Sequence, residues 1–378
     1  MKTKLIEANH HSAEELTSRG ALAAKRFAAK PTGPTLRSGA HATGIPFPKG
    51  LAPVPEPLKP TPSRSSPLPR ADIIIMMDTT AESAAAADVL TPGFTATQWY
   101  DYAHNYESHF VPLLRKGAPA LESKRLGGYL PVTIKGRKAL IFKSDLHMSQ
   151  DAKKLPDGTN SLPLKDMLKQ IIQEAEPKWF LTTGTSGGVY CGMHLGDVVV
   201  TRAARFICAK DFGKAVFNNK TFRSNWAVPK TMAAAAQKIM QKYASNLTGR
   251  GTPPAKNCSC CSDGKHPTDI HFDGQNGIPE FHPVLTVDYF EFGTSTNNLD
   301  KLGVAIEEDD AVLGLACSEL KNPPKWVSVR NLSDTAVNGK LAESLQKQCA
   351  GFGYSHYGYW TSVNSALTAW SIAVGLKG

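Results

Sequence analysis

The chain of 378 residues could hold two domains or one large one, and its composition, 41% hydrophobic and 20% charged, is ordinary for a water-soluble globular protein. No apolar run approaches the roughly 18 residues of a membrane helix, and the first residues lack the apolar centre of a secretory signal. The net charge is +10, but residues 1–70 hold eleven Lys or Arg against four Glu, so most of the excess belongs to the N-terminal tail. Neither this tail nor the rest of the chain indicates a nucleic-acid groove.

The first seventy residues differ in composition from the rest, and we assign residues 1–70 to a basic, Pro-rich arm. Residues 11–29 predict an amphipathic helix in which Ser12 is the N-cap and Glu15 completes a capping box. The eleven prolines of residues 31–69 cannot build a packed core and are typical of a PPII-like or disordered segment. A flexible leader and an arm that wraps a partner subunit are both open.

The globular part is assigned to residues 71–378. Residues 71–77 are a continuous apolar run of the buried-strand type, and an alanine-rich helix at residues 83–90 follows a polar turn. Residues 164–176 predict a helix with one apolar face, which leads into a strand at residues 179–182. Strands that alternate with helices predict an α/β fold with a largely parallel or mixed sheet.

Several polar segments follow predicted strands. Residues 129–134 and 138–142 suggest a hairpin, and His147 comes just after it, where open α/β sheets place ligand contacts. Residues 182–189 read T-T-G-T-S-G-G-V, a Gly-rich, hydroxyl-rich turn that offers backbone N–H groups to an anion or a sugar. Another strand is predicted at residues 195–201.

Residues 229–246 predict a further helix, and residues 247–283 form a loop-rich insertion. Three cysteines and a histidine of this insertion lie within nine positions, but C-x-C-C does not match the ligand spacing of common structural zinc sites. We therefore expect incidental cysteines rather than a metal site at Cys258, Cys260, Cys261 and His266. The seven cysteines of the chain lack the rhythm of a secreted scaffold, which indicates a reducing, cytoplasmic location.

A block of four consecutive carboxylates, residues 307–310, opens an apolar helical run. A short β run follows at residues 326–329, and Asp334 comes shortly after it. Carboxylates at a helix start are favoured by the helix dipole and by free N–H groups, so capping explains part of the block. The alternative is that the block and Asp334 form two acidic ends of one pocket.

The remaining elements are a strand at residues 284–292, which carries Phe290 near its exit, and two C-terminal helices. These helices are expected at residues 341–349 and 362–374, separated by the aromatic, Gly-rich loop 351–360. The aromatic side chains of this loop could form a binding surface or pack against the last helix.

Five motifs in this order resemble those of the purine nucleoside phosphorylase and methylthioadenosine/adenosylhomocysteine nucleosidase superfamily: T-G-T-S-G-G, L-G-D-V-V-V, V-D-Y-F, I-E-E-D-D-A and V-R-N-L-S-D. The match covers residues 71–340. It implies a single α/β domain with a twisted, partly barrel-like mixed sheet flanked by helices, assembled into dimers, trimers or hexamers. It also implies a small nucleoside or nucleotide as substrate, water or phosphate as co-substrate, and no metal or organic cofactor.

The resemblance also implies roles for individual residues in breaking an N-glycosidic bond, which builds cationic charge on the ribose and negative charge on the base. The E-M-E signature of the family falls on E-E-D here, so the ribose contact passes to the shorter Asp309 or to Glu308. The resemblance implies that Asp334 is the acid at the base, that Glu82 orients water and that Phe290 stacks on the base. It implies a pocket lined by Thr185, Ser186 and Gly187, with Glu307, Glu308 and Asp309 at the ribose. Secondary candidates are His147 for the 5′ end of the sugar and Trp226 for a lid over the site.

Hydrolysis is preferred over phosphorolysis on the ligands that phosphate needs. The first strand ends without glycine, and Thr182 stands where one branch of the family carries a phosphate-binding arginine. Arg202 and Arg205 keep phosphorolysis open, and could equally recognise the phosphate of a nucleotide substrate. A non-catalytic nucleoside-binding or storage protein of the same fold is a further alternative, because a fold does not fix a function.

Overall fold

The computed structural model describes residue 42 and residues 44–249, 251–258 and 268–377. Its helices are α4 (Thr80–Leu90), α5 (Pro119–Ser123), α6 (Pro163–Ala175), α7 (Ala233–Tyr243), α8 (Asp310–Ser318) and α9 (Glu343–Gly375). Its strands are β1 (Val54–Pro55), β2 (Ile73–Met77), β3 (Tyr100–Tyr102), β4 (Gly127–Ile134), β5 (Arg137–Ser144), β6 (Trp179–Gly188), β7 (Val198–Thr201), β8 (Ala203–Phe206), β9 (Thr221–Arg223), β10 (Ile270–Phe272), β11 (Val284–Thr286), β12 (Ala305–Glu307) and β13 (Lys325–Asp334).

The strands form one branched, mixed sheet with β6 at its centre. The main path runs β1-β4-β5-β2-β6-β12-β11-β8-β9, while β13 pairs with both β6 and β7. Because Arg202 alone separates β7 from β8, the branch through β13 and the branch through β12 meet again and close a partial barrel. The predicted α/β class with a mixed, partly barrel-like sheet is confirmed, as is the hairpin of β4 and β5.

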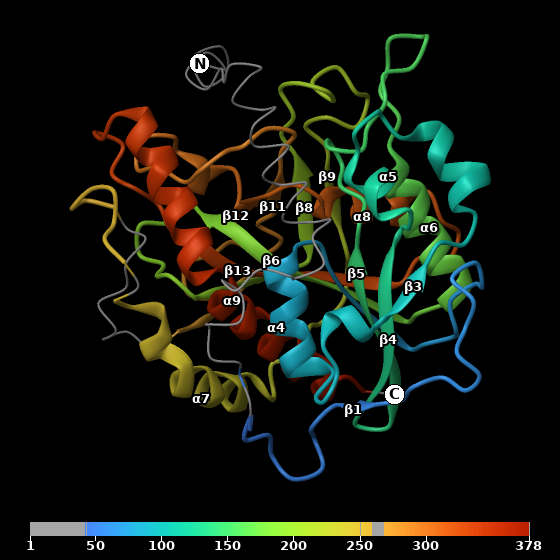
Figure 1. The fold of residues 1–378 in the computed structure, drawn as a ribbon. Helices are drawn as coiled ribbons and strands as arrows, with labels where there is room; N and C mark the ends of the chain where they lie inside the picture. Colours follow the sequence, from blue (N-terminus) through green and yellow to red (C-terminus); the bar gives the residue numbers. More distant parts are fainter. Residues whose placement is uncertain (1–41, 43, 250, 259–267, 378) are drawn as a thin grey trace.

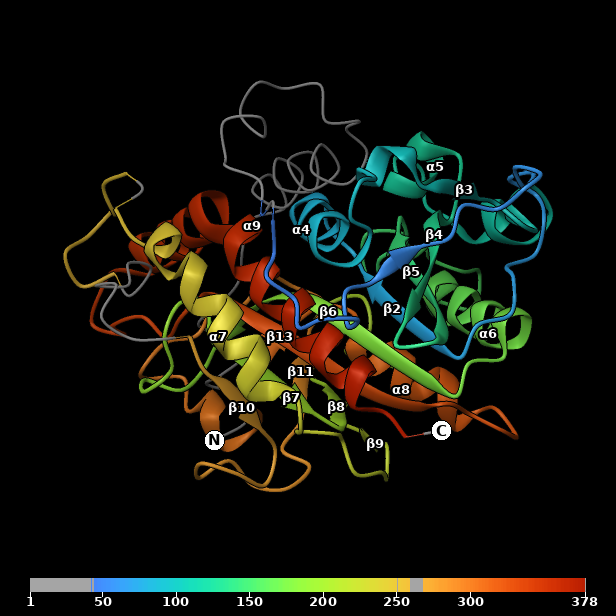
Figure 2. The ribbon, with the colours of Figure 1, turned by 90° about the horizontal axis from the view of Figure 1, so that it is seen from below.

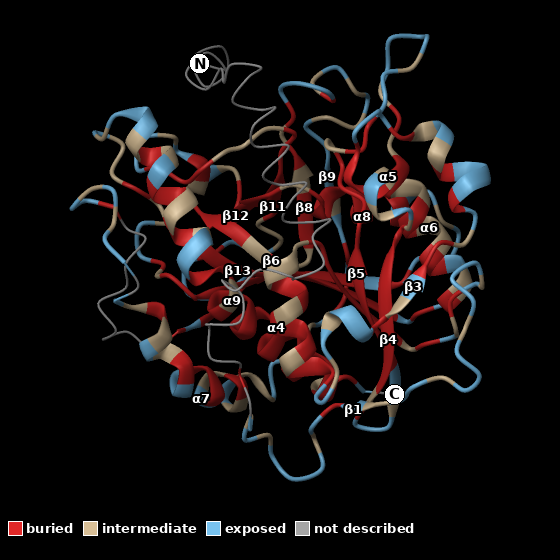
Figure 3. Ribbon diagram, viewed as in Figure 1, coloured by how far each residue is buried: buried red, intermediate tan, exposed pale blue. Residues whose placement is uncertain are grey.

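Helices cover both faces of the sheet, with α4, α7 and α9 on one side and α6 and α8 on the other (Figure 1; Figure 2). The central strands are buried between these layers, as Figure 3 shows. All five residues of β2 are buried, and alternate side chains join the two cores: Ile74 packs with α6 and α8, and Ile75 with α4 and α9. Burial of each such side chain contributes about 1.5–3 kcal/mol.

The Gly-rich segment after residue 182 is not a turn, as the sequence suggested, but the second half of β6. Both of its edges are hydrogen bonded: Thr185 pairs with Asn331 of β13, and Gly187 pairs with Ile306 of β12. Two long-range partners therefore override the local preference of glycine for turns. The consequence is that Thr185, Ser186 and Gly187 have alternating orientations along a strand.

The C-terminal region is one continuous helix of 33 residues, α9, so the loop predicted at residues 351–360 is wrong. Each glycine in a helix interior costs about 1 kcal/mol relative to alanine. Burial of large side chains offsets this cost, because Tyr357 and Trp360 are 0% and 3% exposed in the core beneath α4 and α7.

Residues 44–70 of the N-terminal arm pack on the chain's own domain rather than projecting from it. Val54 pairs with Thr133 at the sheet edge, and the ring of Phe47 lies 4.9 Å from that of Trp370. The indole Nε1 of Trp370 donates to the carbonyl of Leu51 at 2.7 Å. The helix expected at residues 11–29 lies outside the described residues.

The insertion predicted at residues 247–283 contains β10, which pairs with β7, and a disulfide that the sequence did not predict. Cys258 is joined to Cys349 at the start of α9, so Cys258 is not incidental; the other three candidate ligands lie outside the described residues. A disulfide is typical of an oxidising compartment, and the cytoplasmic location stays a prediction. Within the described residues, no helix has the length and apolarity needed to cross a membrane.

The ends of three elements differ from those predicted. Helix α4 begins at Thr80 rather than at residue 83, because Thr79 and Glu82 form a capping box. Strand β11 ends at Thr286, so Phe290 lies in the segment beyond it. Helix α7 begins at Ala233, after Pro229 rather than at it.

Candidate active site

Glu82 lies in the first turn of α4 with 2% of its surface exposed. Its Oε2 accepts hydrogen bonds from the N–H groups of Asp78 and Thr79, both at 2.9 Å. Its Oε1 accepts from the N–H of Thr185 at 2.8 Å and from Thr185 Oγ1 at 2.6 Å. These four donors fill the lone-pair positions of one carboxylate. Glu82 is therefore the tie between the turn after β2 and the end of β6.

Asp334 ends β13, directly beside Gly187 of β6. A Cβ atom added at Gly187 would lie 3.2 Å from Asp334 Oδ2, so the glycine leaves room for this carboxyl. Ser333 Oγ donates to Asp334 Oδ1 at 2.9 Å. Burial raises the pKa of Asp334 to about 7, against the lowering effect of the Ser333 hydrogen bond. Asp334 can therefore carry a proton at neutral pH.

Glu307, one of the residues predicted to bind the sugar, caps the start of α8. Its Oε2 accepts from the N–H groups of Asp309 and Asp310 at 2.6 and 2.9 Å, and Thr286 Oγ1 donates to Oε1. The capping interpretation of the acidic block therefore holds for this residue. Burial and the neighbouring Asp310 raise the pKa of Glu307 well above its ordinary value.

Asp309 is also bound within the protein. Its Oδ1 accepts from the N–H of Met148 at 2.8 Å, and its Oδ2 lies 2.9 Å from Nδ1 of His147. Burial lowers the pKa of His147, but the Asp309 carboxylate outweighs this effect and raises it to about 9. The pair joins the loop after β5 to the start of α8. His147 and Asp309 are thus brought together, as partners of each other.

Glu308 is the acid of the block that stays partly exposed, whereas its three neighbours are buried. Burial and the Asp309 carboxylate raise its pKa to about 7, while a hydrogen bond with the Gln150 side chain lowers it. Between the two ribose contacts that the sequence left open, the geometry therefore favours Glu308 over Asp309.

Arg330, in the middle of β13, is the cation at the centre of this acidic region. It is 3% exposed, and it binds Asp310 through both Nε, at 2.9 Å from Oδ2, and Nη2. The same Nη2 lies 3.4 Å from Glu307 and 3.6 Å from Asp78. Burial lowers the pKa of Arg330, but Asp310 and Glu307 raise it well above its ordinary value, so Arg330 stays charged.

Asp78 follows β2 and connects the two halves of the site. Its Oδ2 faces Arg330, and its N–H group donates to Glu82. Its Oδ1 is buried without a hydrogen-bond partner among the described residues. Burial, and then the Asp309 carboxylate, raise the pKa of Asp78 to about 8.

Phe290 lies in the segment that leads back toward the end of β6. Its side chain is partly buried, 6.1 Å from the ring of Phe292, and packs on the cluster around the Cys258–Cys349 disulfide. Two residues after Phe292, at Thr294, the chain bridges to Val337, just beyond Asp334. Phe290 therefore packs on a cluster that contains both Val337, three residues beyond Asp334, and Cys258 of the insertion.

Three of the other candidates are engaged elsewhere. Ser186 Oγ donates to the carbonyl of Asn331, and Arg202 forms ion pairs with Asp273 and Glu280. Trp226 donates its Nε1 to the carbonyl of Trp326 at 2.9 Å, near the start of β13 and far along the strand from Asp334. The prediction of a Trp226 lid is wrong.

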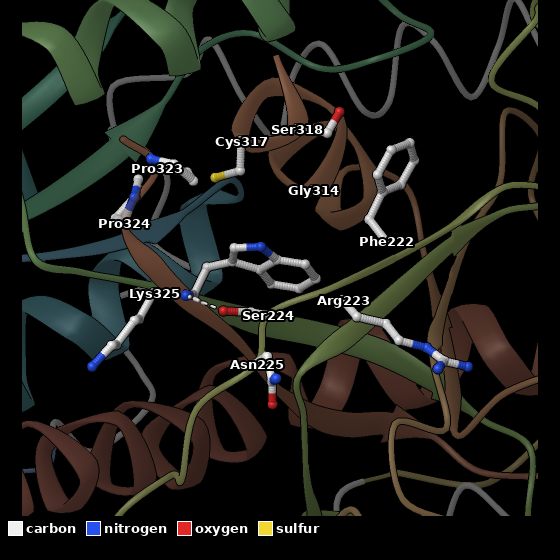
Figure 4. A pocket seen from close by; sticks show the side chains of 11 residues that line it. Phe222, Arg223, Ser224, Asn225, Gly314, Cys317, Ser318, Pro323, Pro324 and Lys325 are labelled. Carbon is white, nitrogen blue, oxygen red and sulfur yellow. Dashed lines mark hydrogen bonds between the residues drawn. The ribbon is translucent and has the colours of Figure 1, made fainter. Parts of the chain in front are cut away.

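A cavity of about 270 Å³ also lies at this opposite end of β13, between β9 and α8 (Figure 4). No predicted site residue lines it. Its cationic side chains are Arg223 and Lys325, and its thiol, Cys317, has a pKa raised to about 12 by burial. No Asp or Glu side chain of the described residues lines this cavity, whereas the expected reaction needs acidic groups. We therefore assign the candidate site to the acidic end of the sheet.

Sequence reasoning missed Asp78 and Arg330, and it placed Asp310 in the acidic block without a role of its own. Arg330 gave a signal, because a charged residue within a strand of otherwise apolar and small polar residues must find a partner if it is buried. Asp78 ends the most apolar strand of the chain, where the same argument applies. Within the described residues, no group of three or more His, Cys, Asp or Glu side chains is arranged to hold a metal ion.

No protein-family model and no curated protein sequence matches the chain. Among solved structures, it is similar to a 5′-methylthioadenosine/S-adenosylhomocysteine nucleosidase from Neisseria meningitidis, at 13% identity and a TM-score of 0.47 over 81% of this chain and 100% of that one. For the same nucleosidase from Helicobacter pylori, the identity is 11% and the TM-score is 0.47, over 81% of this chain and 99% of that one. For futalosine hydrolase of Helicobacter pylori, the identity is 9% and the TM-score is 0.46, over 80% of this chain and 97% of that one.

Proposed function

We propose that the protein cleaves the N-glycosidic bond of a purine nucleoside or nucleotide and that water is the nucleophile. Such a reaction needs an acid at the departing base, an anionic group near the ribose, and a place where water can be activated. The acidic end of the sheet supplies all three kinds of group, on β13, at the start of α8 and in the turn after β2.

The observation that carries the proposal is the carboxyl of Asp334. It stands at a strand end beside a glycine, and desolvation raises its pKa to about 7, so a substantial fraction of Asp334 carries a proton at neutral pH. A general acid is most effective when its pKa lies near the working pH. Protonation of the leaving base at a ring nitrogen neutralises the charge that develops there as the bond breaks.

The sugar end of the proposal rests on Glu308. Glu307 and Asp309 hold hydrogen bonds within the protein, whereas Glu308 is partly exposed. Its carboxylate can accept hydrogen bonds from the ribose hydroxyls and stabilise cationic charge on the ring. Phe290 supplies an aromatic face for the base, and Glu82 positions the Thr185 hydroxyl.

Hydrolysis is preferred because two of the arginines that could bind phosphate have carboxylate partners. Arg330 is bound by Asp310 and Glu307, and Arg202 by Asp273 and Glu280. Arg205 keeps phosphorolysis as the second candidate, since its Nε is buried without a hydrogen-bond partner among the described residues. It lies on β8, which β11 and β12 separate from β6.

The test is release of free base from adenosine, inosine, methylthioadenosine and AMP, with and without inorganic phosphate. We expect release without phosphate from at least one of the four. Release only with phosphate would instead establish the phosphorylase. Binding without any release would contradict both and leave a nucleoside-binding protein. The oligomeric state expected from the resemblance is measured on the same sample by light scattering.

A further inference from the structure

Asp78 is a buried acid in the candidate site for which the resemblance gives no role. It comes directly after β2, and 5% of its surface is exposed. Side chains alternate along β2, so Asp78 continues the row of Ile74 and Met76, which faces α6 and α8. Arg330 lies on this side too, 3.6 Å from Asp78 Oδ2.

The two oxygens of the Asp78 carboxyl differ in their surroundings. Oδ2 faces a guanidinium that is already bound to Asp310. Oδ1 has no hydrogen-bond partner in the part of the chain that the structure describes. Buried polar atoms are nearly always paired, and an exception calls for a functional explanation. An oxygen that accepts a proton during a reaction is such an explanation.

Glu82, the acid that the resemblance assigns to water, is poorly suited to take a proton. Its four acceptor positions are filled by three backbone N–H groups and the Thr185 hydroxyl. A proton on either oxygen would displace one of these donors and break the capping box of α4. Asp78 is adjacent, because its N–H group donates to Glu82. Unlike the oxygens of Glu82, its Oδ1 accepts no hydrogen bond from the described residues.

Charged groups surround Asp78 from every element packed against it. They are Asp309 at the start of α8, Arg330 on β13, His147 after β5 and Glu82 on α4. Asp309 and Glu82 disfavour the carboxylate form, and Arg330 and His147 favour it. Burial is the largest effect, and together these influences raise the pKa of Asp78 to about 8, so its carboxylate form is a strong proton acceptor.

We propose that Asp78 is the general base of the reaction and removes a proton from the attacking water. The inference rests on the proposed function and deepens it. The water oxygen forms a bond to the anomeric carbon while the bond to the base nitrogen breaks and its electron pair leaves with the base. One proton of the water passes to Asp78, and Asp334 gives its proton to a ring nitrogen of the base. The products are the free base and the free sugar.

The test uses the full chain and the nucleoside that it cleaves fastest without phosphate. Asp78→Asn is expected to lower kcat by about 100-fold or more, the contribution of a general base, with KM within about threefold of the wild type. The matched control is Asp72→Asn, at the other end of β2, where the carboxylate is partly exposed and lies 3.4 Å from Lys178. This control is expected to keep full activity.

The pH profile separates a base from a structural residue. Wild-type kcat/KM is expected to rise and then fall with pH, because the base must be deprotonated and the acid protonated. Asp78→Asn is expected to lose the rising limb and keep the falling one. Its fold is checked by circular dichroism and thermal unfolding; because Asn resembles the protonated form, we expect no loss of stability.

Two results would overturn the inference while leaving the proposed function intact. One is a folded Asp78→Asn variant with activity within threefold of the wild type. The other needs no variant: a wild-type profile that stays flat from pH 8 down to pH 5. If the wild type releases no base from any substrate, the proposed function itself fails and the role of Asp78 falls with it.

Discussion

Asp334 shows how the surroundings of a single carboxyl can set its chemistry. No cation is among the causes that shift its pKa, and the Ser333 hydroxyl lowers it only partly against burial. Glu82 is more deeply buried than Asp334, but its carboxylate is held by four donors. Two acids in one site are therefore suited to different tasks, one to carry a proton and the other to hold structure.

The first prediction concerns Asp334→Asn, which cannot donate a proton to the base. We expect kcat/KM to fall by about 100-fold or more, measured as base release. In the wild type, the falling limb of the pH profile should belong to Asp334, because activity is lost as this acid gives up its proton. Ser333→Ala removes a hydrogen bond that favours the carboxylate, so this falling limb should move to higher pH. Full activity in Asp334→Asn would refute the assignment.

The second prediction concerns Arg330, the buried cation. Arg330→Met leaves Asp310, which it binds through both Nε and Nη2, without its compensating charge. Loss of one partner of a buried ion pair costs about 3–5 kcal/mol, to be measured as the free energy of unfolding in urea. Lys165→Met, which removes a partly exposed ion pair with Glu319, should cost at most about 1 kcal/mol. Equal costs for both variants would contradict this account of the network.

At the scale of elements, the contact between α4 and β6 requires a glycine. Gly184 has a φ of +151°, and a Cβ atom there would lie 2.5 Å from Cδ of Glu82. Gly184→Ala should therefore displace Glu82 and strain the backbone, at a cost of about 1–3 kcal/mol or more, and should reduce activity. Gly192→Ala is the control, since nothing lies within 4 Å of its Cβ position. Equal melting temperatures would contradict this prediction.

Elements whose signal is local could be predicted from the sequence. The apolar run of β2, the amphipathic α6 and the β4–β5 hairpin each carry their pattern within a few residues. The second half of β6 could not be predicted, because its strand conformation depends on β12 and β13, more than a hundred residues away. Helix α9 crosses several glycines for a similar reason: its stability comes from packing on α4, α7 and β13 rather than from propensity.

The same distinction applies to the site. Motif order located Asp334, Glu82 and the acidic block, and the structure brings most of these residues to one end of the sheet. The separate roles of Glu307 and Asp309 could not be predicted from the sequence. They depend on hydrogen bonds to Thr286, His147 and Met148, which are distant in the chain. The roles of Asp78 and Arg330 could not be predicted either, because they follow from the proximity of the two side chains in the folded chain.

At the scale of the whole molecule, the Cys258–Cys349 disulfide links the insertion to α9 across 91 residues. Loss of a native disulfide typically costs about 2–5 kcal/mol. Cys349→Ser, or a reducing agent added to the wild type, should therefore lower the melting temperature. Cys191→Ser, at an exposed free cysteine, should leave it unchanged. A melting temperature that does not respond to reduction would contradict a stabilising role for this disulfide.

The central claim is that water cleaves an N-glycosidic bond at the acidic end of this sheet. The most direct measurement is the stoichiometry of free base and free sugar released from a purine nucleoside or nucleotide in phosphate-free buffer. We expect equal amounts of the two products from the wild type. For Asp334→Asn we expect the rate to fall by about 100-fold or more. Absence of product from the wild type, or equal rates for both proteins, would contradict it.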